Sequence, residues 1–264
     1  RPLGYTYMDV RKFREEYLAE FLQQEGQLFR LKSGLWRGQL REAVPHYHYV
    51  AGVDVARKED WMATAILELE SQQLVGLLRS RHQDWALQKA ASMSLLERYP
   101  NLLVHIDSTG VGDPIAQDYR AEGFEVVDVL FTPKIKSELV ENLLLAIDQC
   151  YLGIPDEQET KWLIEELRQY ECVKQPSGHL KYGAPEGKHD DGVTALMLAA
   201  WGLHGQWRHP QAAEVIEPNW WARPGMNWEW LDYERQVRAF RRHFPDRQPP
   251  MHPPDLAWPL LGRR

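Results

Sequence analysis

The chain has 264 residues, of which 44% are hydrophobic, and this size suits one sizeable domain with appendages or two small domains. Its formal net charge of -7 argues against a broad basic surface that would hold nucleic acid by charge alone. The two cysteines, Cys150 and Cys172, lie in no CxxC or Cys/His pattern, so neither a zinc site nor a disulfide scaffold is expected. No run of roughly 18 to 20 apolar residues that could cross a bilayer occurs, which predicts a soluble protein without membrane contact.

The first 47 residues are predicted to lead into the main domain. The chain does not begin with Met and shows no signal-peptide pattern, so we expect a fragment whose N-terminal context is missing. Residues 9–24 place apolar side chains on one face at helical spacing, which predicts an amphipathic helix. Gly34, Gly38 and Pro45 then interrupt the pattern. Residues 1–47 are therefore expected to form a lead-in helix and a connector.

The main domain is predicted over residues 48–204, with the pattern of an α/β fold. Three neighbouring strand patterns predict an antiparallel meander, and after a helix the chain alternates between strands and helices. The expected strands cover residues 49–56, 64–70, 73–81, 102–107 and 124–131, and the expected helices cover 84–99, 114–123, 137–153, 160–170 and 189–203. Two short runs around a Pro-Ser-Gly turn within residues 171–187 predict an additional β-hairpin. Together these elements predict a central mixed β-sheet flanked by helices.

The last part of the chain, residues 205–264, differs in composition from the rest. It holds six of the eleven tryptophans and many prolines, and it contains one candidate amphipathic helix before a proline-rich end. We expect this segment to be an appendage that wraps the domain or docks on a partner.

Four aspartates stand where metal chemistry would need them. Asp54 lies within an apolar strand, where a charge is costly unless it is paired or bound to metal. Asp107 ends the apolar strand LLVHID, at the carboxyl end where α/β sheets tend to place ligands. Asp190 and Asp191 open the last predicted helix. Cleavage of a phosphodiester by two Mg²⁺ or Mn²⁺ ions, roughly 3.5 to 4 Å apart, needs three or four such carboxylates.

Each aspartate also has a purely structural interpretation. Asp107, followed by Ser, Thr and Gly, could be a turn or cap residue. Asp190 or Asp191 alone could be an ordinary N-cap. Asp54 could be a buried acceptor satisfied by hydrogen bonds. The ordered set favours a metal site more strongly than any single residue does.

Four stretches resemble a known family when they are taken in order. They are GVDVARKEDWMATAIL, HIDSTGVGDPIAQDYRAEGFEV, FTPKIKSELVENLLLAI and YGAPEGKHDDGVTALMLAAW. Over about residues 48–203 the sequence resembles the nuclease domain of the large terminase subunit of tailed bacteriophages and herpesviruses, and the combined signal is specific although each motif alone is weak. The resemblance implies an RNase H-like, RuvC-type fold and a metal-dependent endonuclease that cuts concatemeric viral DNA during packaging.

The same resemblance implies roles for individual residues. Asp54 would bridge both metal ions, and Asp107 would be the second ligand. The third ligand would come from Asp190 or Asp191. We favour Asp191 only slightly, because both residues lie in one helical turn and the spacing cannot decide between them. His189 would support the site or face the DNA, although a solvated turn residue is an equal interpretation. The resemblance thus implies a two-metal site for Mg²⁺ or Mn²⁺, with the second ion completed by DNA.

Basic residues near the predicted site are candidates for DNA contact. The resemblance puts a lysine near the site in the region of Lys134 and Lys136, where it could neutralise a phosphate. In the hairpin and after it, His179, Lys181 and Lys188 could follow a DNA backbone. Surface lysines at a helix start and a solvated hairpin remain the structural alternatives.

The resemblance also implies partners that the sequence does not contain. A complete large terminase carries an ATPase domain, yet no GxxxxGK[ST] phosphate loop occurs here, so no ATPase activity is expected. Double-stranded DNA, the portal and the small terminase subunit are the implied partners, in the host cell cytoplasm. A junction resolvase or transposase-type nuclease is an alternative within the fold, although the acidic balance and the lead-in helix favour packaging. From another class, the chain could be a non-catalytic module that docks on DNA or the portal.

Overall fold

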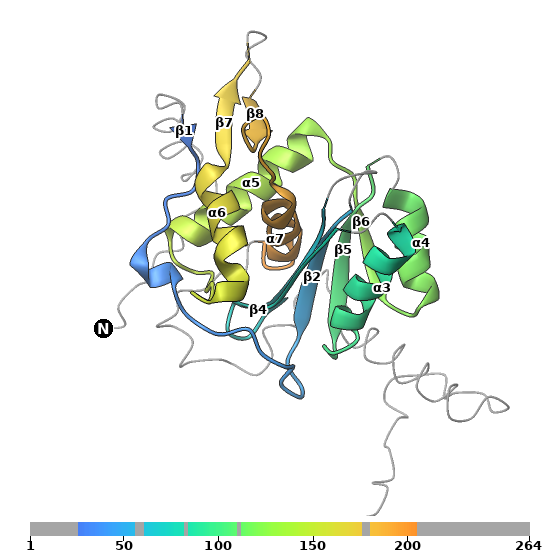
Figure 1. The fold of residues 1–264 in the computed structure, drawn as a ribbon. Helices are drawn as coiled ribbons and strands as arrows, with labels where there is room; N and C mark the ends of the chain where they lie inside the picture. The colour runs from blue at the N-terminus through green and yellow to red at the C-terminus, as the bar shows by residue number, and fades with distance from the viewer. Residues whose placement is uncertain (1–25, 56–60, 82–83, 110–111, 176–179, 205–264) are drawn as a thin grey trace, which may run out of the picture. The chain divides into compact units, whose positions relative to one another are not determined.

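A five-stranded mixed β-sheet lies at the centre of the fold (Figure 1). The computed structural model describes residues 26–55, 61–81, 84–109, 112–175 and 180–204. The predicted lead-in helix and the predicted C-terminal appendage lie outside these residues. In the order in which they pair, the strands are β4 (Gln73–Ser80), β3 (Met62–Glu68), β2 (Tyr49–Asp54), β5 (Leu102–Asp107) and β6 (Glu125–Val129).

The sheet combines the two pairing modes that its sequence predicts. Strands β2, β3 and β4 form an antiparallel meander, whereas β5 pairs parallel to β2 and β6 pairs parallel to β5. Every residue of β3 is buried, because helices cover the sheet on both faces. The expected mixed sheet, with an antiparallel meander and parallel strands, is therefore confirmed.

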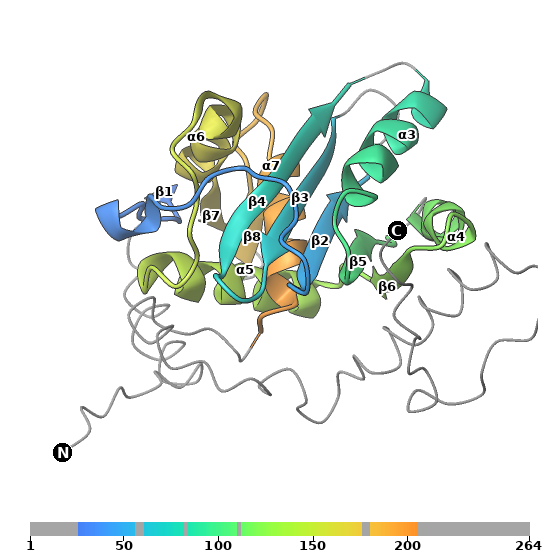
Figure 2. The same ribbon diagram turned by 90° about the horizontal axis from the view of Figure 1, so that it is seen from below.

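The helices divide between the two faces of this sheet (Figures 1 and 2). Helices α3 and α4 cover one face, and α5, α6 and α7 lie on the other. Their bounds are α3 (Trp85–Leu96), α4 (Gly112–Ala121), α5 (Pro133–Asp148), α6 (Lys161–Gln169) and α7 (Asp191–Trp201). Single turns of 3-10 helix cover η2 (Ser33–Leu35) and η3 (Gln158–Thr160).

Strand alternation sorts the side chains of β2 between these faces. Tyr49, Ala51 and Val53 belong to the apolar core against α3 and α4. The residues between them, Gly52 and Asp54, face the opposite way because successive side chains of a strand alternate. Asp54 therefore belongs to the face that α7 covers.

A second, three-stranded sheet extends the fold beyond the central one. Its order is β1-β7-β8, with β1 (Gly26–Gln27), β7 (Glu171–Lys174) and β8 (Leu180–Gly183) all antiparallel. Strands β7 and β8 confirm the predicted hairpin, although the turn over residues 176–179 lies outside the described part.

The stretch before residue 48, expected to be a connector, also contributes to the packed core. Leu28, Phe29 and Leu35 are fully buried. The Ile154 amide donates to the carbonyl oxygen of Leu35 at 2.9 Å, and the Phe29 and Tyr170 ring centroids lie 5.4 Å apart. The described residues of this stretch are thus packed with the domain, while the division at residue 48 stays a prediction.

Helix α5 begins at Pro133, four residues earlier than the sequence pattern predicts. The Thr132 hydroxyl accepts a hydrogen bond from the Ile135 amide at 3.2 Å, and proline occupies the first helical position. Both features favour a helix start, because they satisfy or remove otherwise unpaired amide groups. Lys134 and Lys136 consequently lie in the first turns of a helix.

Among the described helices, none is long and apolar enough to cross a membrane.

Candidate metal centre

The first two predicted ligands lie side by side at the carboxyl ends of parallel strands. Val53 of β2 pairs in register with Ile106 of β5, so Asp54 and Asp107 follow at the next position of each strand. Both aspartates are on the α7 face by strand alternation. The Asp107 Oδ1 atom accepts a hydrogen bond from the Thr109 amide at 2.8 Å, so the turn predicted after Asp107 also orients its carboxylate.

Helix α7 runs antiparallel to β2 and brings its N-terminus to Asp54. A Cβ atom on Gly52 would lie 2.0 Å from the carbonyl oxygen of Ala195, so only glycine permits this close approach of helix and strand. A Cβ atom on Gly202, after the end of α7, would lie 2.6 Å from Val50, at the other end of β2. The start of α7 must therefore lie beside Asp54.

A buried histidine fixes α7 against the neighbouring strand β5. The Nδ1 atom of His105 lies 2.8 Å from the carbonyl oxygen of Leu198, which can only accept, so Nδ1 carries the proton. Burial lowers the pKa of His105. The neutral imidazole thus links β5 to α7 within the same face that carries Asp54 and Asp107.

Negative charge accumulates around Asp54. Asp54 is partly buried, and the resulting desolvation raises the pKa of its carboxyl group well above the ordinary 3.8. The carboxylates of Asp191, Asp107 and Asp190 raise the pKa further, in decreasing order of effect, while Lys136 lowers it. The other three predicted aspartates therefore all act electrostatically on Asp54, against the opposing effect of Lys136.

The two aspartates at the start of α7 have different surroundings. The Asp190 Oδ2 atom accepts a hydrogen bond from the Ala184 amide at 3.3 Å, and Asp190 makes no side-chain cap bond to the helix. The Asp191 Oδ2 atom lies 3.5 Å from Arg79 and 3.7 Å from Nδ1 of His189. Asp191 has the larger effect on Asp54, which favours it over Asp190 as the principal ligand.

The predicted DNA-contacting residues divide into those near the aspartates and those away from them. Lys136 acts on Asp54, whereas Lys134 is 84% exposed and lies 3.9 Å from Glu138. Lys181 on β8 and Lys188 before α7 are exposed, and His189, half-exposed, lies beside Asp191. The remaining predicted residue, His179, lies outside the described residues.

Sequence reasoning missed a cluster that adjoins Asp191. Arg79 at the end of β4 contacts Glu166 of α6 as well as Asp191, and its guanidinium stacks on Trp61 and Trp162. The only sequence signals were two charges: Arg79 near the end of the apolar run QLVGLLRS, and Glu166 on the apolar face of a predicted helix.

The donor set suits a hard divalent cation. Carboxylate oxygens are the ligands that Mg²⁺ and Mn²⁺ prefer, and three further carboxylates act on Asp54. Among the described residues, no three acidic, histidine or cysteine side chains already converge as a formed ion site.

The mixed sheet, the aspartates at its parallel strand ends and the acidic start of α7 define an RNase H-like domain. The family model for the terminase RNaseH-like domain matches residues 51–201. The chain belongs to this family, which confirms the expected fold and the expected assignment to the nuclease part of a large terminase.

Relatives with known names support this assignment. The chain is 29% identical over 206 residues to the large terminase subunit of Thermus virus P23-45 and 28% identical to that of Thermus phage G20c. Each match covers 73% of this chain and 41% of the relative, so the chain spans about two fifths of the length of these curated relatives.

Solved structures of nuclease domains are similar as well. The large terminase nuclease of thermophilic phage G20c is 26% identical, with a TM-score of 0.58, and the match covers 69% of this chain and 100% of that one. Structures of the same nuclease with bound magnesium and with bound cobalt match equally well. The nuclease domain of the Thermus phage P74-26 large terminase is 27% identical, with a TM-score of 0.55, over 63% of this chain and 92% of that one.

Proposed function

We propose that this chain is a divalent-metal-dependent endonuclease domain that cleaves concatemeric double-stranded viral DNA during genome packaging. The observation that carries the proposal is the unbalanced negative charge at Asp54, where two parallel strand ends and the start of α7 meet. A buried carboxyl group surrounded by other carboxylates is costly unless a cation joins it. The magnesium bound to the G20c relative supports a divalent cation as that partner.

The chain supplies the ligands and the positions that this reaction needs. Asp54, Asp107 and Asp191 would hold the divalent cations, and Asp190 would support the start of α7. When bound, divalent ions lower the pKa of an attacking water and stabilise the leaving oxygen. Lys136 would approach a non-bridging phosphate oxygen, because it is the basic residue that acts on Asp54.

We further propose that Mg²⁺ or Mn²⁺ occupies a two-metal site that DNA completes. We expect weak binding of cations by the free protein, since the scissile phosphate would supply missing oxygen ligands. Titration calorimetry that finds two tight Mn²⁺ sites without DNA would contradict this version.

DNA contacts outside the metal site would be made to the backbone. Lys181, Lys188, His189 and His179 would follow the phosphates, because phosphate contacts position DNA without reading its sequence. Little sequence preference is therefore expected. In the whole protein we propose an ATPase domain of the same polypeptide, the portal and the small terminase subunit as partners, and the host cell cytoplasm as the place of action.

A plasmid-cleavage assay tests the proposed activity. Supercoiled DNA is incubated with Mn²⁺, Mg²⁺, Ca²⁺ or EDTA and with the native protein, Asp107→Asn or Asp128→Asn. Asp128 is the matched control, since it is a partly exposed aspartate on the adjacent parallel strand, paired with Arg120. We expect cleavage with Mn²⁺ or Mg²⁺ that vanishes in EDTA and in Asp107→Asn but persists in Asp128→Asn.

Two other results would contradict the proposal. Cleavage that survives in folded Asp107→Asn would show that the proposed site, of which Asp107 is part, does not carry out the reaction. No cleavage with any metal, combined with DNA binding that Asp107→Asn leaves unchanged, would favour a docking module instead.

A further inference from the structure

Arg79 is held between two tryptophans beside the candidate metal centre. Its guanidinium carbon lies 4.3 Å from the ring centroid of Trp61, at the start of β3, and 5.1 Å from that of Trp162 on α6. Only 17% of the Arg79 side chain is exposed. The two cation–π contacts hold the guanidinium in place, and its partial burial strengthens its attraction to nearby charges.

The two ends of this guanidinium contact different carboxylates. The Nη1 atom of Arg79 lies 3.2 Å from Oε1 of Glu166, and the Nη2 atom lies 3.5 Å from Oδ2 of Asp191. Arg79 therefore connects the end of β4 with α6 and with the first residue of α7. A planar fork of donors suits such a bridge, whereas the single ammonium of lysine does not.

Glu166 continues this connection into the backbone of α7. Its Oε2 atom accepts a hydrogen bond from the Gly192 amide at 2.8 Å. A Cβ atom on Gly192 would lie 2.3 Å from the Trp162 ring, so the first turn of α7 rests directly on that ring. Glu166 thus binds the backbone at the start of α7, while Arg79 contacts both Glu166 and Asp191.

We propose that Arg79 is a positioning residue that sets the carboxylate of Asp191 for divalent cation binding. This inference rests on the proposed function of the aspartates. Because Arg79 and His189 approach the same Asp191 oxygen, Oδ2, they define the direction of the other oxygen, Oδ1. The two tryptophans and Glu166 fix Arg79 itself, so the cluster connects three elements to one metal ligand.

A positioning role and a simple charge effect predict opposite outcomes. If Arg79 were only a nearby positive charge, its removal would strengthen cation binding, and lysine would replace it fully. If Arg79 positions Asp191, both its removal and its replacement by lysine weaken cation binding. Groups that orient a metal ligand typically change metal affinity about 10- to 100-fold when they are replaced.

The test is a Mn²⁺ titration of the folded protein without DNA, in which electron paramagnetic resonance counts the free ion. The variants are Arg79→Met, Arg79→Lys and, as the matched control, Arg81→Met. Arg81 stacks on the same Trp61 ring, at 5.6 Å, but within the described structure it forms no ion pair with Asp191 or Glu166. Circular dichroism and thermal melting establish that the compared variants are folded.

We expect the Mn²⁺ dissociation constant to rise about tenfold in Arg79→Met and in Arg79→Lys and to change less than about twofold in Arg81→Met. Arg79→Lys decides the question if Arg79→Met does not fold. Native or tighter affinity in folded Arg79→Lys overturns the inference, and so does an equal loss in Arg81→Met. Mn²⁺ binding that Asp54→Asn leaves intact would instead overturn the proposed function, so the two failures are distinguishable.

Discussion

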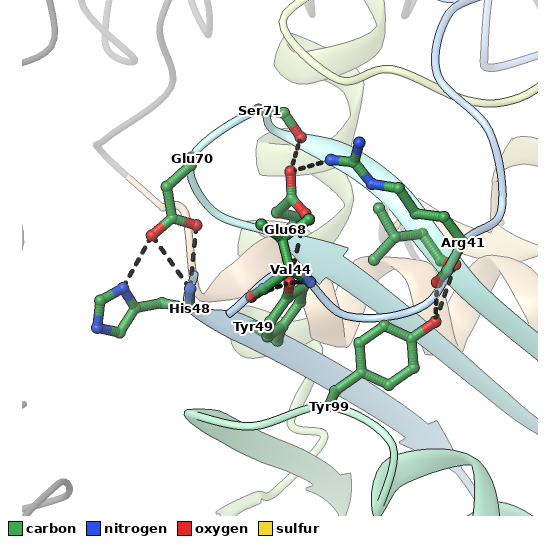
Figure 3. Close-up of polar contacts among 9 residues, drawn as sticks. Arg41, Val44, His48, Tyr49, Glu68, Glu70, Ser71 and Tyr99 are labelled. Carbon is green, nitrogen blue, oxygen red and sulfur yellow. Dashed lines mark hydrogen bonds and ion pairs between the residues drawn. The ribbon is translucent and has the colours of Figure 1, made fainter. Parts of the chain in front are cut away.

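Acidic groups lie at both ends of strand β2, but the charges and hydrogen-bond donors around them differ between the two ends. At the amino end, Glu68 lies opposite Tyr49 and is fully buried (Figure 3). Its carboxylate forms an ion pair with Arg41 and accepts hydrogen bonds from the hydroxyls of Ser71, at 2.7 Å, and Tyr49, at 3.4 Å. Each acceptor oxygen of Glu68 therefore has a donor from the protein.

Glu70, at the same end, is compensated in a similar way. Its carboxylate accepts from the His48 amide at 3.0 and 3.1 Å, and Nδ1 of His48 lies 2.8 Å from Oε1 (Figure 3). A carboxylate that receives its donors from the protein has a structural role and needs no added cation.

The carboxyl end of the same strand has the opposite balance. Around Asp54 three further carboxylates raise its pKa and Lys136 lowers it, while Arg79 pairs with one of the three, Asp191. The comparison teaches that burial alone does not mark a functional acid. A cluster of several carboxylates is the stronger signal, because a bound divalent cation would offset their mutual repulsion.

The largest expected effect separates the two ends by activity. Asp54→Asn should reduce Mn²⁺-dependent plasmid cleavage at least about a hundredfold, because charge stabilisation of the transition state is lost. Glu68→Gln should cleave at the native rate per folded molecule. Initial cleavage rates, normalised to the folded fraction, check both. Equal losses in the two variants would break the distinction between the ends.

The next effect separates the ends by stability. Arg41→Met leaves the buried Glu68 carboxylate without its cation and should lower the free energy of unfolding by about 2 to 3 kcal/mol, with native activity at low temperature. Arg98→Met, which breaks an exposed ion pair with Glu42, is the control and should change stability little. Urea denaturation measures both values. A stability loss in Arg98→Met as large as that in Arg41→Met would show that burial does not decide the effect.

A smaller effect is expected for the stability of the metal-free protein. Asp54→Asn should raise its melting temperature by a few degrees, because one of four crowded charges is removed. Unfolded aspartate ionises near 3.8, whereas the folded pKa is higher, so between these values the folded protein holds a proton that the unfolded chain has released. The contribution of Asp54 to stability therefore falls as pH rises through this window.

The pH dependence gives this prediction its control. The stability advantage of Asp54→Asn should vanish below the ordinary aspartate pKa, where the native residue is protonated in both states. Added Mn²⁺ should stabilise the native protein and leave Asp54→Asn nearly unchanged. Thermal melts across pH, with and without Mn²⁺, measure all three differences, and a variant less stable than the native protein at neutral pH would be the contrary result.

The smallest effects are expected for the lysines that are proposed to contact DNA. Lys181→Ala and Lys188→Ala should each weaken DNA binding a few-fold and lower the slope of log affinity against log salt by about one. Lys161→Ala is the control, because this exposed lysine at the start of α6 is not among the proposed DNA contacts. Fluorescence anisotropy with a duplex at several salt concentrations gives the slopes. Equal slopes for native protein and all three variants would remove these lysines from the interface.

Much of the fold was predictable because its signals are local. The apolar strands and their order appear in the sequence, and both Asp54 and Asp107 stand out as acids in or at the end of apolar runs. Strand β1 was missed, because two residues are too few to show a periodic pattern.

The assembly of the candidate site depends on contacts that no local pattern shows. A glycine such as Gly52 within a strand indicates a close approach of backbone, but it does not say that α7 makes the approach. Arg79 and Glu166 look like surface charges in the sequence, but Arg79 lies over two tryptophan rings and Glu166 is buried beside it. The choice between Asp190 and Asp191 likewise depends on side-chain contacts, since both occupy one helical turn.

The most direct test of the central claim is a crystal of the protein soaked in Mn²⁺, with the ion located by its anomalous scattering. The account predicts a peak bound by carboxylate oxygens of Asp54 and Asp107, with Asp191 nearby, and no peak at Glu68 or Glu70. A peak at the paired acids, or none among the four aspartates at saturating Mn²⁺, would contradict it.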